Sequence, residues 1–374
     1  MKLKFITVSI SLWIVSIASA QEHMDKLINI WSKGMPYASS TLAVDDSGYV
    51  YLTGMFEDTV YFGSWDNFVV PQDSTDFFII KIKPNGSTVW KKIISGLGSE
   101  WLHDIEIDKT GNVYFIGAYN YSVRVDNLYV ESGLETGTEL GSDSFLCKLD
   151  SDGKPIALIS RSENNEYLHL RCLELDQKGN IYLMGSTKEN KAFDFEFNPD
   201  PSQGDYHDFV VCINDSFETE WLITLCDNVE ILNTGGYGLS TITTDQNNLY
   251  VSGYKSGDFN ELFVSKLTMD GSEIWTDTLH SRSYASTGGL FTDQDGNVYL
   301  TGGDYGVFAK FSPDGEKLWT MMIETRVWTS VVNQDGYTVA TYYQHFGTLD
   351  GFIIIDPDGD IIYDYPFEGI EVQQ

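Results

Sequence analysis

The sequence predicts an all-β fold made of repeated antiparallel units, and three observations lead to this prediction. One hairpin pattern recurs six times along the 374 residues. A second hairpin of nearly constant length follows each copy, and no segment shows the periodicity of an amphipathic helix. Repetition of this kind is typical of architectures in which each unit packs against its neighbours.

The first hairpin joins an apolar strand ending in Asp or Asn to a second strand with Tyr at a fixed offset. Asp293…Gly296-Asn297-Val298-Tyr299 is the clearest copy. Asp caps a tight turn, and Gly takes the positive φ that the turn requires. The other copies contain Asp45, Asp108, Asp176, Asp245 and, in a degenerate form, Asn333. Five of the second strands end in a glycine: Gly54, Gly117, Gly185, Gly253 and Gly302.

The second hairpin places a tryptophan nine residues after a lysine. Lys81 with Trp90, Lys266 with Trp275 and Lys310 with Trp319 keep this spacing. Cys212 replaces the lysine before Trp221, while Lys148 to Ala157 and Ile354 to Tyr363 are degenerate copies. Turns such as Pro313-Asp314-Gly315 separate the two strands and favour a type I turn followed by a bulge. We interpret the recurring Trp and Tyr as packing between units.

Four short antiparallel strands per unit predict a β-propeller, because one blade cannot cover both faces of its own sheet. Six blades are favoured, and seven with an incomplete blade is the alternative. We expect a signal peptide at residues 1–20 and a single propeller domain at 21–374. The repeats span approximately residues 38–100, 101–166, 167–230, 231–283, 284–327 and 328–367, and residues 27–33 resemble an extra outer strand.

The N-terminus predicts export. Met1 to Lys4 is positively charged, Phe5 to Ile17 is apolar, and Ala18-Ser19-Ala20 supplies a small-residue cleavage pattern. The apolar run is too short for a typical membrane span, so an N-terminal anchor is the weaker alternative. We therefore expect a secreted protein, extracellular or periplasmic, cleaved after Ala20.

The charge balance excludes two classes of partner. The chain has 23 Lys and Arg against 55 Asp and Glu, a formal net charge of −32. Binding to nucleic acid or to an anionic membrane surface requires a cationic patch, so we expect neither, and we expect no membrane insertion. An extracellular glycan, peptide or protein is the expected partner, and the chain is expected to be a monomer.

The four cysteines, Cys147, Cys172, Cys212 and Cys226, match no zinc or CxxC pattern. Export makes a disulfide possible. The cysteines nevertheless lie in apolar strand patterns, which favours buried free thiols.

The pattern Asp-x-x-Gly-Asn-Val-Tyr-x-Thr-Gly, followed by Lys-x-x-Pro-Asp-Gly-x-x-x-Trp, resembles the bacterial beta-propeller repeat family called SBBP. The resemblance is strongest from Asp293 to Trp319 and from Asp45 to Trp90, and it covers roughly residues 38 to 367. It implies an extracellular or cell-surface propeller. It implies no catalytic residue, because the family's motif is structural.

Two acidic segments invite a calcium interpretation, namely Asp293 to Asn297 and Asp356 to Asp360. An EF-hand loop needs Gly at its sixth position and a bidentate Glu at its twelfth. Gly is the fourth residue in both segments, so we predict hairpin turns. We expect no metal site and no cofactor in this protein, and no catalytic residue is assigned.

Candidate binding residues lie near the start of two blades and in the long connections. His103 and His169 come close to Trp101 and Tyr167 in sequence. The connections between second and third strands are longest at 55–75, 118–142 and 186–207, and long loops on a rigid frame commonly carry binding residues. The ligand-binding candidates are Trp65, Trp101, His103, Tyr119, Tyr121, Tyr167 and His169.

Two functions follow from these features. The first is non-catalytic binding of a glycan, peptide or surface protein. The alternative is an extracellular polysaccharide hydrolase or lyase, with acids drawn from Glu57, Asp58, Asp104 and Glu166. Two carboxylates facing each other across ~5–10 Å in one pocket would favour the enzyme.

Overall fold

A computed structural model describes fifteen segments of the chain, and all of them are strands, turns or bends without a helix. No helix long and apolar enough to cross a bilayer occurs in these segments. The described residues are 41–56, 60–62, 66–68, 75–132, 143–160, 168–187, 191–193, 195–196, 207–224, 241–245, 247–255, 260–281, 287–302, 306–343 and 351–366. The expected signal peptide at 1–20 and the expected extra outer strand at 27–33 lie outside them.

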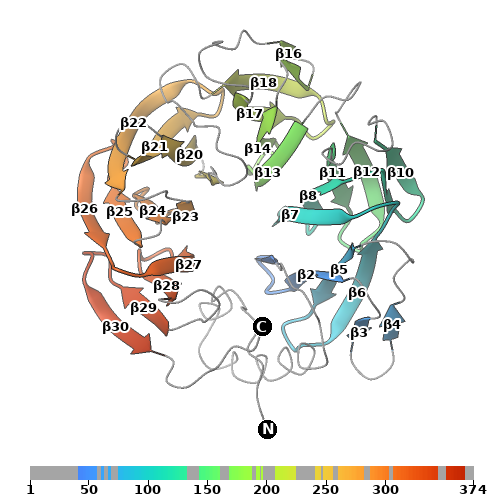
Figure 1. Cartoon of the computed structure of the whole chain (residues 1–374), viewed down its shortest axis with the longest axis horizontal. Helices are drawn as coiled ribbons and strands as arrows, with labels where there is room; N and C mark the ends of the chain where they lie inside the picture. The colour runs from blue at the N-terminus through green and yellow to red at the C-terminus, as the bar shows by residue number, and fades with distance from the viewer. Residues whose placement is uncertain are drawn as a thin grey trace. The chain divides into compact units, whose positions relative to one another are not determined.

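The described residues form two compact units, with the boundary between Glu220 and Trp221. Unit 1 contains three four-stranded antiparallel sheets (Figure 1). The first is β1 (Leu42–Val44), β2 (Val50–Phe56), β5 (Asp76–Ile82) and β6 (Thr88–Ile94). The second is β7 (Glu100–Ile107), β8 (Val113–Tyr119), β11 (Asp143–Leu149) and β12 (Pro155–Ser160). The third is β13 (Leu168–Leu175), β14 (Ile181–Thr187), β17 (His207–Ile213) and β18 (Thr219–Thr224), and β18 crosses the boundary into unit 2 after Glu220.

Each sheet of unit 1 also carries a short hairpin between its second and third strands. These hairpins are β3 (Val60–Phe62) with β4 (Asp66–Phe68), β9 (Ser122–Val125) with β10 (Leu128–Glu131), and β15 (Lys191–Ala192) with β16 (Phe195–Glu196). They occupy the three connections that the sequence marks as long.

Unit 2 repeats the four-stranded pattern without such hairpins in its described residues. Its first sheet is β19 (Ile242–Thr244), β20 (Asn248–Lys255), β21 (Asn260–Thr268) and β22 (Glu273–Ser281). The second is β23 (Thr287–Thr292), β24 (Val298–Gly302), β25 (Val307–Phe311) and β26 (Lys317–Met322). The third is β27 (Arg326–Val332), β28 (Thr338–Tyr343), β29 (Gly351–Ile355) and β30 (Ile361–Pro366).

Four-stranded antiparallel sheets in sequential order are the blades of a β-propeller, so the predicted fold class is confirmed. The described residues form six such sheets, which we number as blades 1 to 6 in chain order. The closure of the ring, with six blades or with an incomplete seventh, and the single domain stay predictions.

The Asp–Gly segments are hairpin turns, as predicted. In the turn between β23 and β24, Asp293 Oδ1 accepts hydrogen bonds from the backbone N–H groups of Asp295 and Asn297, at 3.0 and 2.9 Å. Its Oδ2 accepts from Asn297 Nδ2 at 2.8 Å and from the Tyr299 hydroxyl at 3.0 Å. Gly296 has a φ of 76°, which residues with a Cβ rarely adopt. The fixed Asp–Gly–Tyr spacing therefore encodes one hydrogen-bonded turn.

The nine-residue spacing from lysine to tryptophan encodes a contact between neighbouring blades. Lys81 and Trp90 pair directly across β5 and β6. Lys81 Nζ and Trp90 Nε1 both donate to the carbonyl oxygen of Ser151, in the turn between β11 and β12 of the next blade, at 3.1 and 3.0 Å. The Trp90 ring also packs on Gly153 of that turn, where a Cβ would lie 2.8 Å from the ring. We call this arrangement the inter-blade contact.

The inter-blade contact recurs in unit 2. Lys266 and Trp275 both donate to the Pro313 carbonyl, at 2.8 and 3.1 Å. Lys310 and Trp319 donate in the same way to Pro357, at 3.2 and 3.0 Å. Trp221, which follows Cys212 rather than a lysine, donates to Met269 at 3.1 Å. Cys147 and Cys212 are buried thiols, as expected, whereas Cys172 is only partly buried and Cys226 lies outside the described residues.

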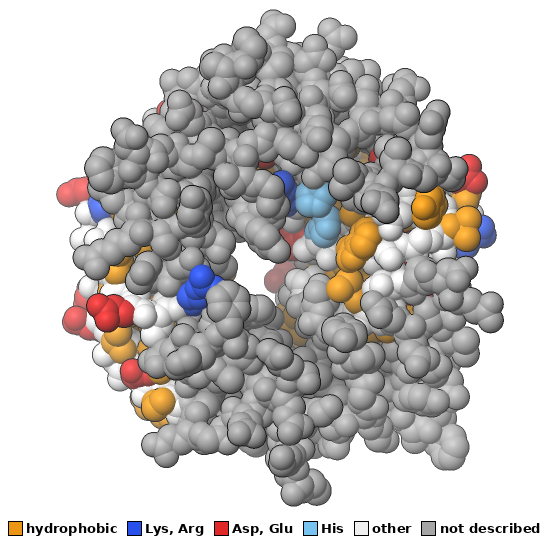
Figure 2. All heavy atoms as spheres, viewed as in Figure 1, with side chains coloured by type: hydrophobic (Ala, Val, Ile, Leu, Met, Phe, Trp, Pro, Cys, Tyr) orange, Lys and Arg blue, Asp and Glu red, His pale blue; other side chains and the backbone are white. Residues whose placement is uncertain are grey.

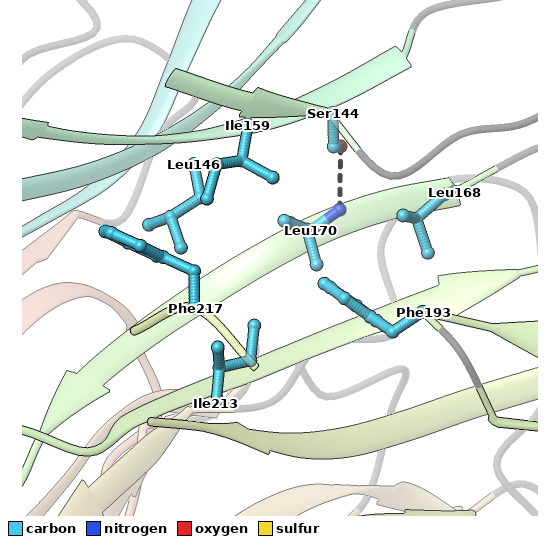
Figure 3. A pocket seen from close by; sticks show the side chains of 8 residues that line it. All are labelled: Ser144, Leu146, Ile159, Leu168, Leu170, Phe193, Ile213 and Phe217. Atoms are coloured by element: carbon cyan, nitrogen blue, oxygen red, sulfur yellow. Dashed lines mark hydrogen bonds between the residues drawn. The ribbon is translucent and has the colours of Figure 1, made fainter. Parts of the chain in front are cut away.

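The contact between blades 2 and 3 departs from this pattern. Ala157 stands opposite Lys148, where blades 1, 4 and 5 have tryptophan and blade 6 has Tyr363. In the turn of blade 3, Phe217 takes the place of the usual glycine and adopts a φ of 63°. Its ring lies beside Leu146 and Ile159 at a small apolar cavity with room for no more than about one water molecule (Figure 3). The aromatic ring missing from blade 2 is thus supplied by the turn of blade 3.

This exchange predicts a compensating pair of substitutions. Ala157→Trp alone overpacks the site and costs about 1–3 kcal/mol of unfolding free energy. Phe217→Gly alone removes the strain of a left-handed backbone but enlarges the cavity. The net cost is about 2–4 kcal/mol of unfolding free energy. The double variant rebuilds the usual contact. Its loss of unfolding free energy is therefore expected to be about 2 kcal/mol smaller than the sum of the two single losses. Denaturant unfolding of the four proteins measures this coupling, and strictly additive losses would show that the two residues do not share a site.

Candidate functional site

Several histidine, arginine and acidic residues of unit 1 lie on β7 and β13, the first strands of blades 2 and 3. Each strand contains a β-bulge, at His103 in β7 and at Arg171 in β13, where the register with the second strand shifts. A bulge turns additional side chains away from the regular alternation. The bulged strands also approach the second strands closely, because a Cβ at Gly117 would lie 2.1 Å from the Trp101 carbonyl oxygen. The recurring glycine at the end of the second strand therefore accommodates this approach.

Acidic residues occupy one repeat position in these two blades only. The position lies two residues before the turn Asp or Asn, and it holds Glu106 in β7 and Glu174 in β13. The equivalent residues in the other blades are Ala43, Thr243, Phe291 and Val331. The shared fold does not require an acid here, so this cluster is particular to blades 2 and 3.

The structure brings His103 and His169 together, with ring centroids 4.8 Å apart. The Nδ1–H of His103 donates to the Leu170 carbonyl of β13 at 2.5 Å. Arg171 Nε donates to His169 Nδ1 at 3.0 Å, and Arg171 also donates to the Ser186 hydroxyl at 3.1 Å. Figure 2 shows histidine side chains (pale blue) beside a basic side chain (blue) on the visible face.

Both histidines are neutral at physiological pH. Burial lowers the pKa of His169 to about 3, and the charges of His103 and Arg171 add to the shift. Burial also lowers the pKa of His103, with the Leu170 carbonyl opposing and Arg171 reinforcing the shift. The pair is therefore part of a fixed hydrogen-bond network that joins β7 to β13.

Carboxyl groups surround this network. Asp104 accepts hydrogen bonds from the backbone N–H groups of Ile105 and Leu173, both at 2.9 Å, yet burial raises its pKa to about 6. Burial raises the pKa of Asp208 to about 6 as well, with Arg171 opposing. Burial raises the pKa of Glu106 well above its usual value, and the nearby Glu174 raises it further.

These groups are held by the fold rather than presented to a ligand. The carboxyl group of Asp104 and the ring of His103 bond to the backbone, and the ring of His169 accepts from the Arg171 side chain. In the part of the chain that the structure describes, no three His, Cys, Asp or Glu side chains are placed to hold a metal ion. The cluster is suited to orienting blades 2 and 3 and to titrating with pH.

A second candidate surface lies where β9 begins. Leu97 and Tyr121 are 66% and 45% exposed, and the Leu97 carbonyl accepts the N–H of Tyr121 at 3.2 Å. Across the hairpin, Tyr129 is 40% exposed, and the Arg124 guanidinium lies over its ring at 4.9 Å. Lys92 of β6 fixes the hairpin tip by an ion pair to Asp126 at 2.6 Å. We call Leu97, Tyr121, Arg124 and Tyr129 the hairpin surface.

The predicted binding residues differ in how exposed their side chains are and in which part of the fold they lie. Tyr121 is exposed on the hairpin surface, Trp101 is half-buried on β7, and the two histidines meet. Tyr119 is fully buried and donates its hydroxyl to Ser160 at 2.9 Å, so its ring belongs to the core. Trp65, Tyr167, Glu57, Asp58 and Glu166 lie outside the described residues. The binding role of each candidate stays a prediction.

Sequence reasoning missed Glu106, Arg171, Glu174 and Asp208. Aligning the six repeats position by position was the available signal for the two glutamates, because only β7 and β13 place an acid two residues before the turn. No comparable sequence signal predicts the role of Arg171. Its position depends on the bulge, and the hydrogen-bond partner of the bulged residue differs from blade to blade.

The raised pKa of Glu106 predicts how stability depends on pH. A carboxyl group with a raised folded-state pKa stabilises the fold fully below its unfolded pKa of 4.5 and loses that contribution as pH rises. Glu106→Gln is therefore expected to gain stability relative to the wild type as the pH rises above 4.5. Denaturant midpoints across this range measure the gain. Glu273→Gln, at an exposed position on β22, is the control, and an equal gain in both variants would refute the assignment.

No family model matches the chain, and no curated protein matches its sequence. Solved structures do match in fold. A puromycin hydrolase mutant shares 11% identity and a TM-score of 0.50 over 91% of this chain and 48% of its own, so this chain spans about half of that protein. BamB from Moraxella catarrhalis shares 15% identity, with a TM-score of 0.40 over 90% of this chain and 85% of its own. The WD40 domain of Pan2 from Neurospora crassa shares 12%, with a TM-score of 0.44 over 86% of each chain. At these identities the likeness concerns the fold alone, and the chain is a β-propeller.

Proposed function

We propose that this protein is an exported propeller of the SBBP-repeat kind that binds an extracellular glycan, peptide or protein without catalysing a reaction. The observation that carries the proposal is the hairpin surface on blade 2. Leu97, Tyr121 and Tyr129 leave large apolar side chains in solvent. Exposed aromatic and arginine side chains on a rigid support are typical of binding hot spots.

The distribution of the hairpins supports this proposal. All three lie in unit 1, and each extends a connection between a second and a third strand. The turns at the other ends of these strands contain the Asp–Tyr bonds and the inter-blade contacts. The hairpins extend one end of these strands, and the stabilising turns at the other end keep the repeated pattern. This is expected where binding residues are added to a repeated frame.

The hairpin surface has the chemistry of a planar binding site. The tyrosine rings and the Arg124 guanidinium offer flat faces, and the Tyr129 hydroxyl already donates to Glu131 at 2.7 Å. A sugar ring or an aromatic or proline side chain of a peptide could stack on such faces. The net charge of −32 disfavours polyanionic ligands, so neutral or cationic partners fit best.

Export is part of the proposal and rests on the sequence of Met1 to Ala20. It would place the mature chain outside the cell or in the periplasm. A monomer is the proposed state, with neither nucleic acid nor a membrane surface as partner.

The alternative of a polysaccharide hydrolase or lyase rests on the adjacent carboxyl groups of Glu106 and Glu174. An acid with a raised pKa beside a second carboxyl group is a feature of such enzymes. Turnover of a polysaccharide that is lost in Glu106→Gln would favour this function over binding.

Substitution of the exposed tyrosines tests the proposal. Tyr121→Ala and Tyr129→Ala are each expected to weaken ligand binding at least about tenfold, because interface tyrosines commonly contribute more than 1 kcal/mol. Glycan arrays and pull-downs with the wild type identify the ligand, and calorimetry compares the variants. Tyr365→Ala removes a tyrosine that is 48% exposed on β30 of unit 2 and serves as the control. Unchanged affinity in both test variants would remove the hairpin surface from consideration.

A further inference from the structure

Two carboxyl groups at the first residues of β5 and β7 are completely buried. Asp76 and Glu100 both have 0% of their surface exposed. They lie within hydrogen-bonding reach of each other, and neither oxygen of either group has a hydrogen-bond partner among the described residues. The two residues belong to neighbouring blades, and the Glu100 N–H donates to the Thr75 carbonyl at 2.9 Å.

This pair has an unbalanced charge. Among the described residues, no basic side chain acts on either carboxyl group. Burial raises the pKa of both groups, and the Gly96 N–H, the nearest donor to Glu100, opposes the rise only partly. A proton shared between the two carboxyl groups removes one negative charge and leaves the second buried. A buried charge without a partner is strongly destabilising, so a cation bound between the two groups would stabilise the pair.

A main-chain oxygen lies next to the pair. The position that a Cβ of Gly96 would occupy is 1.9 Å from the Ser122 carbonyl oxygen and 2.8 Å from Glu100 Oε1. These two oxygens therefore flank the same position, and any side chain at residue 96 would collide with both. Because residue 96 is a glycine, the connection before β7 can approach both the start of β9 and the carboxyl pair.

We propose that Asp76 and Glu100 bind a hard divalent cation, with the Ser122 carbonyl as a neighbouring ligand, and that calcium is the preferred ion. The ligands are all oxygen atoms, which suits calcium or magnesium rather than zinc or copper. Calcium accepts backbone carbonyls and an irregular geometry, whereas magnesium requires a near-ideal octahedron and keeps several waters. The ion joins blade 1 to blade 2 and supports the base of the β9–β10 hairpin.

The inference is independent of the proposed function and differs from a calcium interpretation of the Asp–Gly turns. In those turns the carboxylates accept backbone N–H groups, as Asp356 does from Asp358 and Asp360 at 3.0 and 2.9 Å. Asp76 and Glu100 lack such a set of donors, because only the Gly96 N–H lies near Glu100 and neither carboxyl group forms a hydrogen bond of normal geometry among the described residues. The site depends on residues far apart in sequence and has no local motif.

Calcium titration of chelator-treated full-length protein tests the site. Calcium at about 100 times its Kd is expected to raise the Tm of the wild type by roughly 5 to 10 °C. Asp76→Asn and Glu100→Gln are each expected to reduce this shift and to lower calcium affinity at least about tenfold, measured by calorimetry. Glu106→Gln, which removes another buried acid from β7, is expected to keep the full response.

A shared proton without a metal ion gives a different result. The wild-type Tm would then be insensitive to calcium and magnesium, and Glu100→Gln would stabilise the protein at about pH 9, where the wild type loses its last shared proton. That outcome overturns the proposal, as does a calcium response that both carboxyl variants retain. If Glu100→Gln does not fold, Asp76→Asn decides, together with calcium-reversible terbium luminescence of the wild type.

Discussion

One recurring hydrogen-bond acceptor, the carbonyl oxygen in the turn between the third and fourth strands of blades 2, 4, 5 and 6, underlies much of the described structure. A tryptophan Nε1 from the preceding blade donates to it, and in three contacts a lysine Nζ donates to the same atom. The glycine of the same turn lies against the indole ring because it has no side chain. A blade cannot cover its own two faces, so this contact, repeated from blade to blade, converts separate sheets into a packed array. The lysine also lies over the tyrosine ring of its own second strand, as Lys310 lies over Tyr299 at 5.1 Å.

The interface between blades 2 and 3 differs from the others in both packing and charge. Its aromatic ring comes from Phe217 in the turn instead of from the outer strand. The acids Glu106 and Glu174, with the histidine pair, lie on the first strands of the same two blades. The Leu170 N–H donates to Ser144 Oγ, which lines the Phe217 cavity, while the Leu170 carbonyl accepts from His103. Leu170 therefore connects the cavity to the polar cluster, and this interface departs from the inter-blade contact in both its aromatic residue and its charges.

The fold was predictable from sequence because its determinants are local. Asp293, Gly296 and Tyr299 specify a turn within seven residues, and Lys310 and Trp319 specify the strand pair and the donors of the inter-blade contact. The sites were less predictable because their partners are distant in the chain. The pairing of His103 with His169 requires two bulges and the packing of two blades. The approach of Asp76 to Glu100 joins the starts of two strands in different blades, and Tyr119, exposed by sequence criteria, fills the core.

The central claim is that the inter-blade contact is part of the cooperative core. Hydrogen exchange of the tryptophan indole N–H groups, followed by NMR, tests this claim most directly. The indole protons of Trp90, Trp221, Trp275 and Trp319 are predicted to exchange only through global unfolding, as slowly as the amides of the central strands. Trp101, half-exposed and without an indole hydrogen bond among the described residues, is predicted to exchange rapidly. Rapid exchange at the first four positions would show that the contacts open locally and do not hold the blades together.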